Sequence, residues 1–213
     1  MPIFPNLEFE QALWLEGKIR LVGLDEVGRG AYTASVVAAA VILPNDEKAL
    51  SGLASVRDSK MLSREARVRL VSVIRQTAVA YGIGAASPAE IERFNIRGAT
   101  ALAMKRALNR IGAYDHLLVD GLRVKELGLE QQTAIVKGDA LCLSIACASV
   151  IAKVCRDGLM YKLAARYPGY GWENNVGYGT PEHIEGLNRL GITPHHRRSF
   201  APIRALLRCD DSA

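Results

Sequence analysis

The sequence predicts an α/β fold, in which short apolar strands alternate with helices along a chain of 213 residues. Apolar runs of strand length occur at residues 19–24, 34–43, 79–85, 116–119 and 134–136. Segments with helix-start and helix-stop residues separate most of these runs. The sequence contains no internal repeat and no low-complexity segment. A chain of this length can bury a sizeable core as one large domain.

The expected helices are marked by capping residues. Ser63 is expected to cap a helix that runs to about Ala78. Ser87-Pro88-Ala89-Glu90 combines a capping serine, a proline at the first helical position and a glutamate three residues on. Further helices are predicted at residues 9–15, 99–111, 141–166 and 180–190, with a last amphipathic helix after residue 200. The stretch 167–179, rich in Gly, Tyr and Asn, is predicted to be a loop.

Four acidic residues stand where predicted strands end. Asp25 and Glu26 end the first strand, Asp120 ends the strand at 116–119, and Asp139 follows the last one. Because sites in open α/β sheets form beyond strand ends, these residues can meet in one place. Carboxylate oxygens suit Mg²⁺, and a divalent cation would neutralise like charges that resist joint ionisation. The arrangement favours a metal site, although a simple turn at Asp120 and a helix cap at Asp139 remain alternatives.

Asp25 and Glu26 are adjacent, and adjacent strand residues point to opposite faces of a sheet. Both can therefore reach one metal only if the chain leaves strand geometry here. The turn that follows, Gly28-Arg29-Gly30, would make that departure easy. It lacks the third glycine of a dinucleotide-binding fingerprint, since position 33 is Thr33. We expect its backbone amides to approach a phosphate or a sugar instead.

Several other titratable residues are interpreted as structural or surface residues and not as metal ligands. Asp157 falls four residues after Lys153 on the predicted long helix and is expected to be its surface ion-pair partner. His195 and His196 are assigned to a basic surface, and His183, near a helix start, has no ligand partner four residues on. Soft-metal chemistry is therefore not expected.

Charge and hydropathy narrow the class of protein. The net charge is +5, and residues 151–208 hold nine Lys or Arg against four Asp or Glu, which is the whole excess. A basic C-terminal third beside an acidic centre suits a polyanionic substrate, although a modest excess can also serve solubility alone. No apolar run approaches the roughly 20 residues of a membrane span, and no signal peptide is evident. We predict a cytoplasmic protein without a membrane partner, and nothing demands more than a monomer.

Seven ordered segments resemble one enzyme family. They are Asp25-Glu26-Val27-Gly28-Arg29-Gly30, Asp58-Ser59-Lys60, Val119-Asp120-Gly121, Lys137-Gly138-Asp139 and the stretches 148–157, 177–183 and 194–200. In this order they are similar to the motifs of type 2 ribonuclease H (bacterial ribonuclease HII). The resemblance extends from about residue 19 to residue 200, and the ordered set is far more specific than any single motif.

The resemblance implies a ribonuclease H-like core, a mixed sheet flanked by helices, at residues 1–165. A basic helical C-terminal extension at 166–213 would pack on this core. The implied activity is endonucleolytic hydrolysis of the RNA strand of RNA/DNA hybrids, with cutting 5′ to single ribonucleotides embedded in duplex DNA. The products would carry 3′-hydroxyl and 5′-phosphate ends. The implied cofactor is Mg²⁺ or Mn²⁺ used as a pair of ions, and the implied setting is ribonucleotide excision in DNA replication and repair.

The resemblance also implies roles for individual residues. The catalytic and metal-binding acids would be Asp25, Glu26, Asp120 and Asp139. The turn residues Gly28, Arg29 and Gly30 would contact the 2′-hydroxyl and the flanking phosphates, and Tyr178 would stack by the sugar at the RNA-to-DNA junction. The remaining duplex contacts would come from Ser59, Lys60 and Lys153.

One segment departs from the family pattern. Where the family usually carries Pro-Leu-Ala-Gly-Pro, this chain has Ala31-Tyr32-Thr33-Ala34-Ser35. Without its prolines the loop is expected to be less rigid, and Tyr32 would add bulk where the substrate lies. The sequence leaves alternatives open: a different metal-dependent nuclease or strand transferase on the same fold, and a nucleic-acid-binding module whose acids hold a structural ion. A small-molecule phosphatase is a distant third, because the chain has no covalent nucleophile motif.

Overall fold

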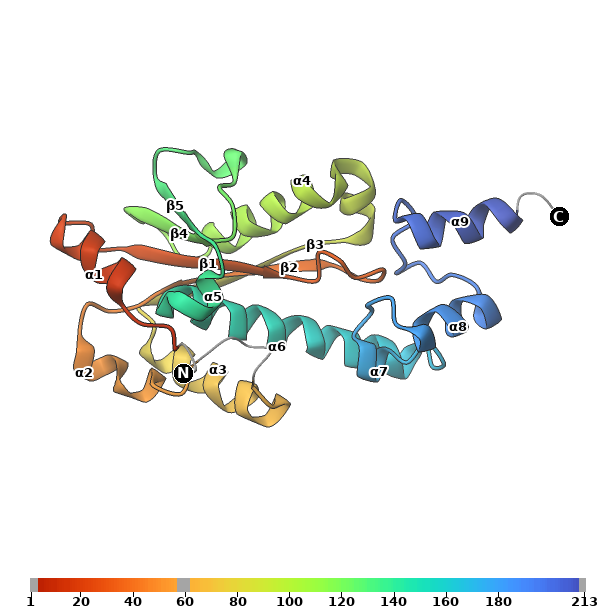
Figure 1. The fold of residues 1–213 in the computed structure, drawn as a ribbon, viewed down its shortest axis with the longest axis horizontal. Coiled ribbons are helices and arrows are strands. Elements are labelled where there is room, and N and C mark those ends of the chain that lie inside the picture. The colour runs from red at the N-terminus through yellow and green to blue at the C-terminus, as the bar shows by residue number, and fades with distance from the viewer. Residues whose placement is uncertain (1–3, 57–61, 211–213) are drawn as a thin grey trace.

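The computed structural model describes residues 4–56 and 62–210, and a five-stranded sheet forms its centre (Figure 1). The strands are β1 (Leu21–Val27), β2 (Val36–Ile42), β3 (Ala80–Ala86), β4 (His116–Asp120) and β5 (Gln132–Ile135), in the order β3-β2-β1-β4-β5. β2 runs antiparallel to β1 and β3, whereas β1, β4 and β5 run parallel to one another. The sheet is therefore mixed, and the carboxyl ends of β1 and β4 meet at one edge.

Helices cover both faces of this sheet (Figure 1). α4 (Pro88–Leu108) packs on one face, and α3 (Arg64–Thr77) and α6 (Leu143–Arg166) pack on the other. The shorter elements are α1 (Glu8–Leu15), α2 (Glu47–Leu50), η1 (Ser51–Leu53), η3 (Lys125–Leu127), α5 (Gly138–Leu141), α7 (Trp172–Asn175), α8 (Pro181–Leu190) and α9 (Ala201–Asp210). The predicted α/β fold is confirmed. Within the described residues, no helix has the length and apolar character needed to cross a membrane.

β2 is buried along its whole length, which explains why its side chains are all small or branched and apolar. Alternate residues serve two cores, because successive side chains of a strand point to opposite faces. Ala39 packs with α3 and α6, whereas Ala38 packs with α4. Close approach of α6 to the sheet requires a glycine in β1: a Cβ on Gly23 would lie 2.1 Å from the carbonyl carbon of Ser144.

The predicted helix starts at Ser63 and Ser87 are confirmed, the second with a complete capping box formed with Glu90. Two interior boundaries differ from the prediction. The helices expected after Ser87 and over 99–111 are joined as α4, which is interrupted at Asn95, where φ is 56°. The helix expected over 141–166 is divided into α5 and α6 by the extended backbone of Cys142.

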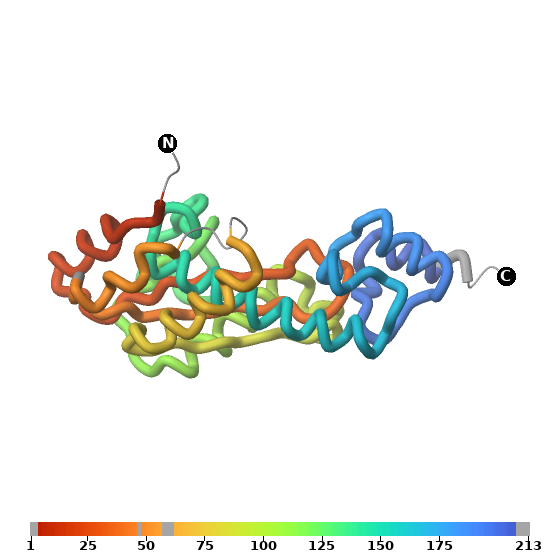
Figure 2. The backbone as a smooth tube through the Cα atoms, turned by 90° about the horizontal axis from the view of Figure 1, so that it is seen from below, coloured from red at the N-terminus to blue at the C-terminus, as the bar shows by residue number. Residues whose placement is uncertain are grey.

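Residues 167–207 surround the C-terminal end of α6 instead of forming another layer on the sheet, as Figure 2 shows. Met160 of α6 is buried in one apolar cluster with Trp172, Leu187 and Ile203. The segment after β1 joins this cluster through a backbone bridge between Thr33 and His196. The C-terminal helices are thus tied to the turn that follows β1.

Candidate functional site

One pocket of about 470 Å³ gathers most of the sequence-predicted site residues, and we term it the acid pocket. Its walls include Asp25, Glu26, Gly28, Arg29, Gly30, Asp120, Asp139, Lys153 and Tyr178. The parallel register places Leu24 beside Val119, so the next residues, Asp25 and Asp120, are neighbours at two strand ends. Two other predicted contacts, Ser59 and Lys60, lie outside the described residues.

Asp25 and Glu26 both remain in β1, so the predicted departure from strand geometry is wrong. In the ladder with β2, Asp25 pairs with Ala39 and Glu26 with Ala38. Cross-strand partners share a face, which puts Asp25 on the α6 side of the sheet and Glu26 on the α4 side. Glu26 consequently lines a second pocket as well. Among residues 4–56 and 62–210, no three His, Cys, Asp or Glu side chains form a ready cluster of metal ligands.

Burial and mutual repulsion shift the pKa values of the two β1 acids. Asp25 is 6% exposed, and burial, followed by the charges of Glu26 and Asp120, raises the pKa of its carboxyl well above its usual range. Burial also raises the pKa of Glu26, against the opposing effect of Arg29, whose Nη1 lies 3.0 Å from Glu26 Oε1. Arg29 offsets part of the carboxylate charge, and the remainder suits a divalent cation.

Asp120 and Asp139 reach the acid pocket from two connected elements. Asp120 Oδ1 accepts the backbone N–H of Gly138 at 2.7 Å, which ties the end of β4 to the start of α5. Lys137 adopts a left-handed φ of 59°, so the chain turns directly from β5 into α5. Asp139 then lies in the first turn of α5, with 9% of its surface exposed. Both side chains therefore have restricted positions at the pocket wall.

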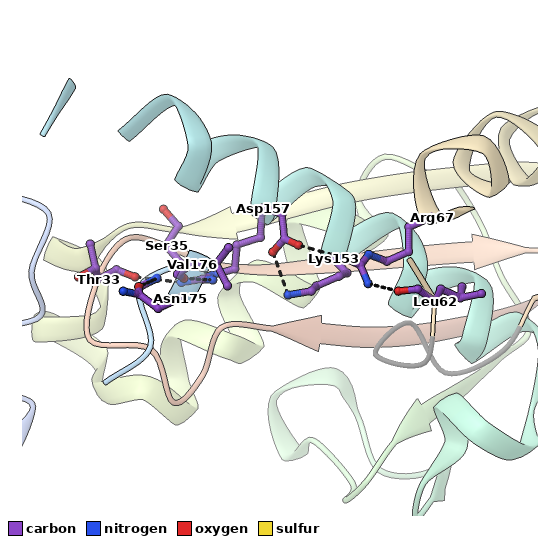
Figure 3. Close-up of polar contacts among 10 residues, drawn as sticks. Thr33, Ser35, Leu62, Arg67, Lys153, Asp157, Asn175 and Val176 are labelled. Carbon is purple, nitrogen blue, oxygen red and sulfur yellow. Dashed lines mark hydrogen bonds and ion pairs between the residues drawn. The ribbon is translucent and has the colours of Figure 1, made fainter. Parts of the chain in front are cut away.

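Lys153 is held at the pocket wall by a buried acid (Figure 3). Its Nζ lies 2.9 Å from Asp157 Oδ1, and Arg67 Nη2 lies 3.7 Å from Asp157 Oδ2. Arg67 also donates to the carbonyl oxygen of Leu62 at 2.7 Å, just before α3. The predicted pairing of Asp157 with Lys153 is confirmed, but the predicted surface position is wrong, because Asp157 is 5% exposed.

The sequence did not predict that Arg156 is fully buried behind the glycine turn. It donates to the carbonyl oxygens of Ser35, Thr33 and Val176 at 3.1, 3.0 and 2.8 Å. A Cβ on Gly28 would lie 2.1 Å from Arg156 Nε, so this glycine is required by the arginine. The guanidinium carbon also lies 5.6 Å from the ring centre of Tyr178. Arg156 therefore supports the turn and Tyr178 together.

Arg197 supports the same turn from the C-terminal extension. It is fully buried and donates to the carbonyl oxygens of Arg29 and Ala34, both at 2.9 Å. Burial and the charge of Arg156 lower the pKa of Arg197 to about 9. The predicted basic segment at 194–200 is thus partly internal, and the sequence carried no signal for this beyond its place in the motif.

His183 and His196 form a buried pair, which corrects the assignment of His196 to a basic surface. Their Nε2 atoms lie 3.2 Å apart, and His183 Nε2 accepts the indole N–H of Trp172 at 3.0 Å. His183 Nδ1 lies 2.9 Å from the carbonyl oxygen of Tyr178, where it can donate. Burial lowers the pKa of His196 to about 4, so this imidazole is neutral near pH 7.

The segment that departs from the family pattern packs into this cluster and away from the acid pocket. Tyr32 lies with its ring centre 6.0 Å from that of His183 and does not line the acid pocket. Its backbone N–H donates to the carbonyl oxygen of Gly177 at 2.8 Å. Ala34 has a left-handed φ of 64° at the position where the family pattern has glycine.

Comparison with known proteins decides the family. A family model described as Ribonuclease HII matches residues 22–203. The chain belongs to the ribonuclease HII family. Over 204 residues it is 57% identical to a ribonuclease HII of Synechococcus sp. (strain JA-3-3Ab), an alignment that covers 95% of this chain and 90% of the relative. Membership makes the protein a nuclease, a hydrolase of the ribonuclease H type, and the alternative of a binding module is wrong.

Solved structures show that the ribonuclease HII family fold is present. Ribonuclease H2 from Pyrococcus horikoshii OT3 superposes with a TM-score of 0.76 at 26% identity, covering 92% of this chain and all of that one. Bst-RNase HIII in complex with Mn²⁺ has a TM-score of 0.70 at 20% identity, covering 92% of this chain and 71% of that one, which is a likeness of fold alone. The predicted ribonuclease H-like mixed sheet is therefore confirmed.

Proposed function

We propose that this ribonuclease HII family member hydrolyses the RNA strand of RNA/DNA hybrids and cuts 5′ to single ribonucleotides embedded in duplex DNA. The products carry 3′-hydroxyl and 5′-phosphate ends. The observation that carries this proposal is the acid pocket, in which four carboxylates share walls with a glycine turn and an aromatic ring. The acids suit phosphodiester hydrolysis, while the turn and Tyr178 suit recognition of a sugar.

Mg²⁺ or Mn²⁺ fits the donor set of the acid pocket. The residues that would hold the ions are Asp25, Glu26, Asp120 and Asp139, whose carboxylate oxygens are the ligands that such cations prefer. The raised pKa of Asp25 is consistent with this assignment, because burial and then the charges of Glu26 and Asp120 disfavour the ionised carboxyl, which a bound cation would favour. Bound there, a pair of divalent ions would activate a water and stabilise the leaving 3′-oxygen.

Recognition of the ribonucleotide is assigned to the turn and to Tyr178. A Cβ on Gly30 would approach only Tyr178 Cε1, at 3.9 Å, so space for a ligand is open beside both residues. The backbone of the turn can then contact a 2′-hydroxyl, the one group that distinguishes RNA from DNA at a residue. Arg29, whose side chain is 55% exposed, and Lys153 would contact the flanking phosphates.

The C-terminal extension, residues 166–213, is assigned to the same folding unit as the core at residues 1–165. The support is Arg197, which reaches from the extension to two carbonyl oxygens of the segment after β1. Its basic surface, with Ser59 and Lys60, would position the duplex without reading sequence. All residues of the acid pocket come from one chain, so a monomer suffices for the activity. We assign this activity to ribonucleotide excision in the cytoplasm, during DNA replication and repair.

A labelled DNA duplex with one embedded ribonucleotide tests the proposal, beside all-DNA and all-hybrid duplexes. With Mg²⁺ or Mn²⁺ we expect a cut on the 5′ side of the ribonucleotide, with no cut in chelator or in all-DNA. Asp120→Asn should abolish cutting, whereas Glu130→Gln, an exposed acid outside the acid pocket, should not. If only the all-hybrid duplex is cut, the junction role of Arg29 and Tyr178 is removed. If neither the hybrid nor the single-ribonucleotide duplex is cut, the proposal is contradicted.

A further inference from the structure

A second pocket, of about 320 Å³, lies on the α4 side of Glu26. It shares Glu26, Arg29 and Asp120 with the acid pocket, but Tyr178 and Lys153 do not line it. We propose that this second pocket, termed the arginine pocket, binds a backbone phosphate of the cleaved strand on the 5′ side of the scissile bond. The inference rests on the proposed function and adds Arg97 and Arg123 to the phosphate contacts that the proposed function assigns to Arg29 and Lys153.

The assignment to the 5′ side of the scissile bond follows from which residues line each of the two pockets. Tyr178 is assigned to the RNA-to-DNA junction, which lies 3′ to the scissile bond when the cut falls 5′ to the ribonucleotide. The shared walls, Glu26 and Asp120, belong to the acids assigned to the reacting phosphate. The arginine pocket extends from these shared walls without Tyr178, so a strand running past Tyr178 and the acids would continue into it with its 5′ part.

Charge selects a phosphate as the ligand. Three arginines line the arginine pocket: Arg29 from the glycine turn, Arg97 from α4 and Arg123 from the segment after β4. Arg97 and Arg123 are both exposed, so their guanidinium groups are accessible to a ligand. The two carboxylates on the walls, Glu26 and Asp120, are among those that divalent cations would neutralise. A cationic excess then remains, and guanidinium groups bind phosphate oxygens in pairs of hydrogen bonds.

Apolar surface selects a nucleotide over a free anion. Leu122, which is 80% exposed, is the lining residue that presents a large apolar side chain, and the nearly buried Met104 and Ala101 of α4 lie behind the wall. An apolar surface beside guanidinium groups matches the sugar and phosphate of a nucleic-acid strand. The arginine pocket therefore suits a nucleotide better than an isolated ion.

The backbone holds both exposed arginines beside the pocket. Asn95 interrupts α4, and its side chain accepts the N–H groups of Arg97 and Gly98 at 2.9 and 3.1 Å, which starts the second part of the helix at the pocket. On the other wall, Gln132 Oε1 accepts the N–H of Val124 at 2.8 Å, next to Arg123. Walls held in place before binding lower the ordering cost of binding.

The first test compares the arginine pocket with a matched surface position. R97Q and R123Q, singly and together, are compared with R110Q, an exposed arginine just beyond α4 that lies outside the pocket. We expect the double variant to raise KM for the single-ribonucleotide duplex about tenfold with little change in kcat, and R110Q to leave both unchanged. The slope of log KM against the logarithm of the salt concentration should also fall by about one unit, as expected for the loss of one phosphate contact. A double variant identical to R110Q would overturn the inference, and melting temperatures check that all variants are folded.

The second test locates the phosphate. Duplexes carrying one uncharged methylphosphonate at successive backbone positions are bound to the wild-type protein and to the double variant in Ca²⁺ instead of Mg²⁺, and gel analysis checks that they stay uncut. One position 5′ to the scissile bond should weaken binding to the wild type but not to the double variant, whereas 3′ positions should weaken both equally. Equal weakening at every position would overturn the inference. Cleavage by the wild type reports separately on the proposed function, so the two failures are distinguishable.

Discussion

The acid pocket and the region behind the glycine turn both gather like charges, but they balance them differently. In the acid pocket, burial and neighbouring carboxylates raise the pKa of Asp25, and four carboxylates share the pocket walls with Arg29 and Lys153. Behind the turn, Arg156 and Arg197 are buried together and donate to five backbone carbonyl oxygens. The comparison indicates that the acids are arranged to bind a ligand, whereas the arginines are arranged to hold the chain.

The two regions meet at the glycine turn. Gly28 backs onto Arg156, the carbonyl oxygen of Arg29 accepts from Arg197, and Gly30 faces the acid pocket. The turn that is assigned to substrate recognition is therefore supported on its inner side by charges that the substrate does not reach. Substitutions on the pocket side of the turn should consequently lower activity alone, whereas substitutions on its inner side should also lower stability.

The largest effect is expected for Asp25→Asn. Cleavage of the single-ribonucleotide duplex should fall by about a thousandfold or more, because a ligand for the divalent ions is lost. The free energy of unfolding should not decrease, because a buried charge that is repelled by Glu26 and Asp120 is removed. Single-turnover cleavage and urea unfolding measure the two quantities, with Glu130→Gln as the control. A clear loss of stability would assign Asp25 to structure.

Arg156→Met should lower stability, which Asp25→Asn should not. The substitution leaves three carbonyl oxygens, two of them buried and one partly buried, without this donor. At about 1 kcal/mol each, the free energy of unfolding should fall by about 3 kcal/mol. Cleavage should also fall, because the glycine turn and Tyr178 lose their common support. Urea unfolding measures the first effect, and Arg110→Met, at an exposed position, should stay within about 0.5 kcal/mol of the wild type. Unchanged stability would contradict the structural role of the buried arginine.

Acidification should loosen the cluster around His196. Its pKa falls from 6.5 to about 4 on folding, so between these values the unfolded chain binds more protons and stability rises with pH. The contribution is fully present above pH 6.5 and is lost as the pH falls toward 4. Between pH 7.5 and pH 5 the loss is about 2 kcal/mol. The difference between the unfolding curves of the wild type and of His196→Gln should show this slope, and parallel curves would disprove it.

The smallest effect is expected at Ala34, which carries a left-handed backbone. Ala34→Gly removes the steric cost of a Cβ in this conformation, about 1 kcal/mol, partly offset by the greater freedom of glycine in the unfolded chain. Thermal unfolding should show a small gain in stability with unchanged cleavage. A loss of stability would mean that the methyl group, 2% exposed in the cluster around Trp172, contributes more by packing than it costs in strain.

The sequence by itself determined the elements and where the acids stand along them. The caps at Ser63 and Ser87 act within one turn of chain, and the acids follow apolar runs, so both could be predicted without a partner. The convergence of Asp25 with Asp120 was also within reach, because parallel strands end at one edge.

Only the tertiary structure decided which side each charge occupies and which charges are buried. The ladder with β2 keeps Asp25 and Glu26 in the strand and places Asp25 on the α6 side and Glu26 on the α4 side, a pairing that lies outside local sequence. The burial of Arg156 and Arg197 was not predictable, because arginines are ordinarily exposed, and the basic run 194–200 gave no reason to place His196 inside. Arg156 and Arg197 bind backbone carbonyl oxygens, which nearly every residue possesses and which leave no pattern in a sequence.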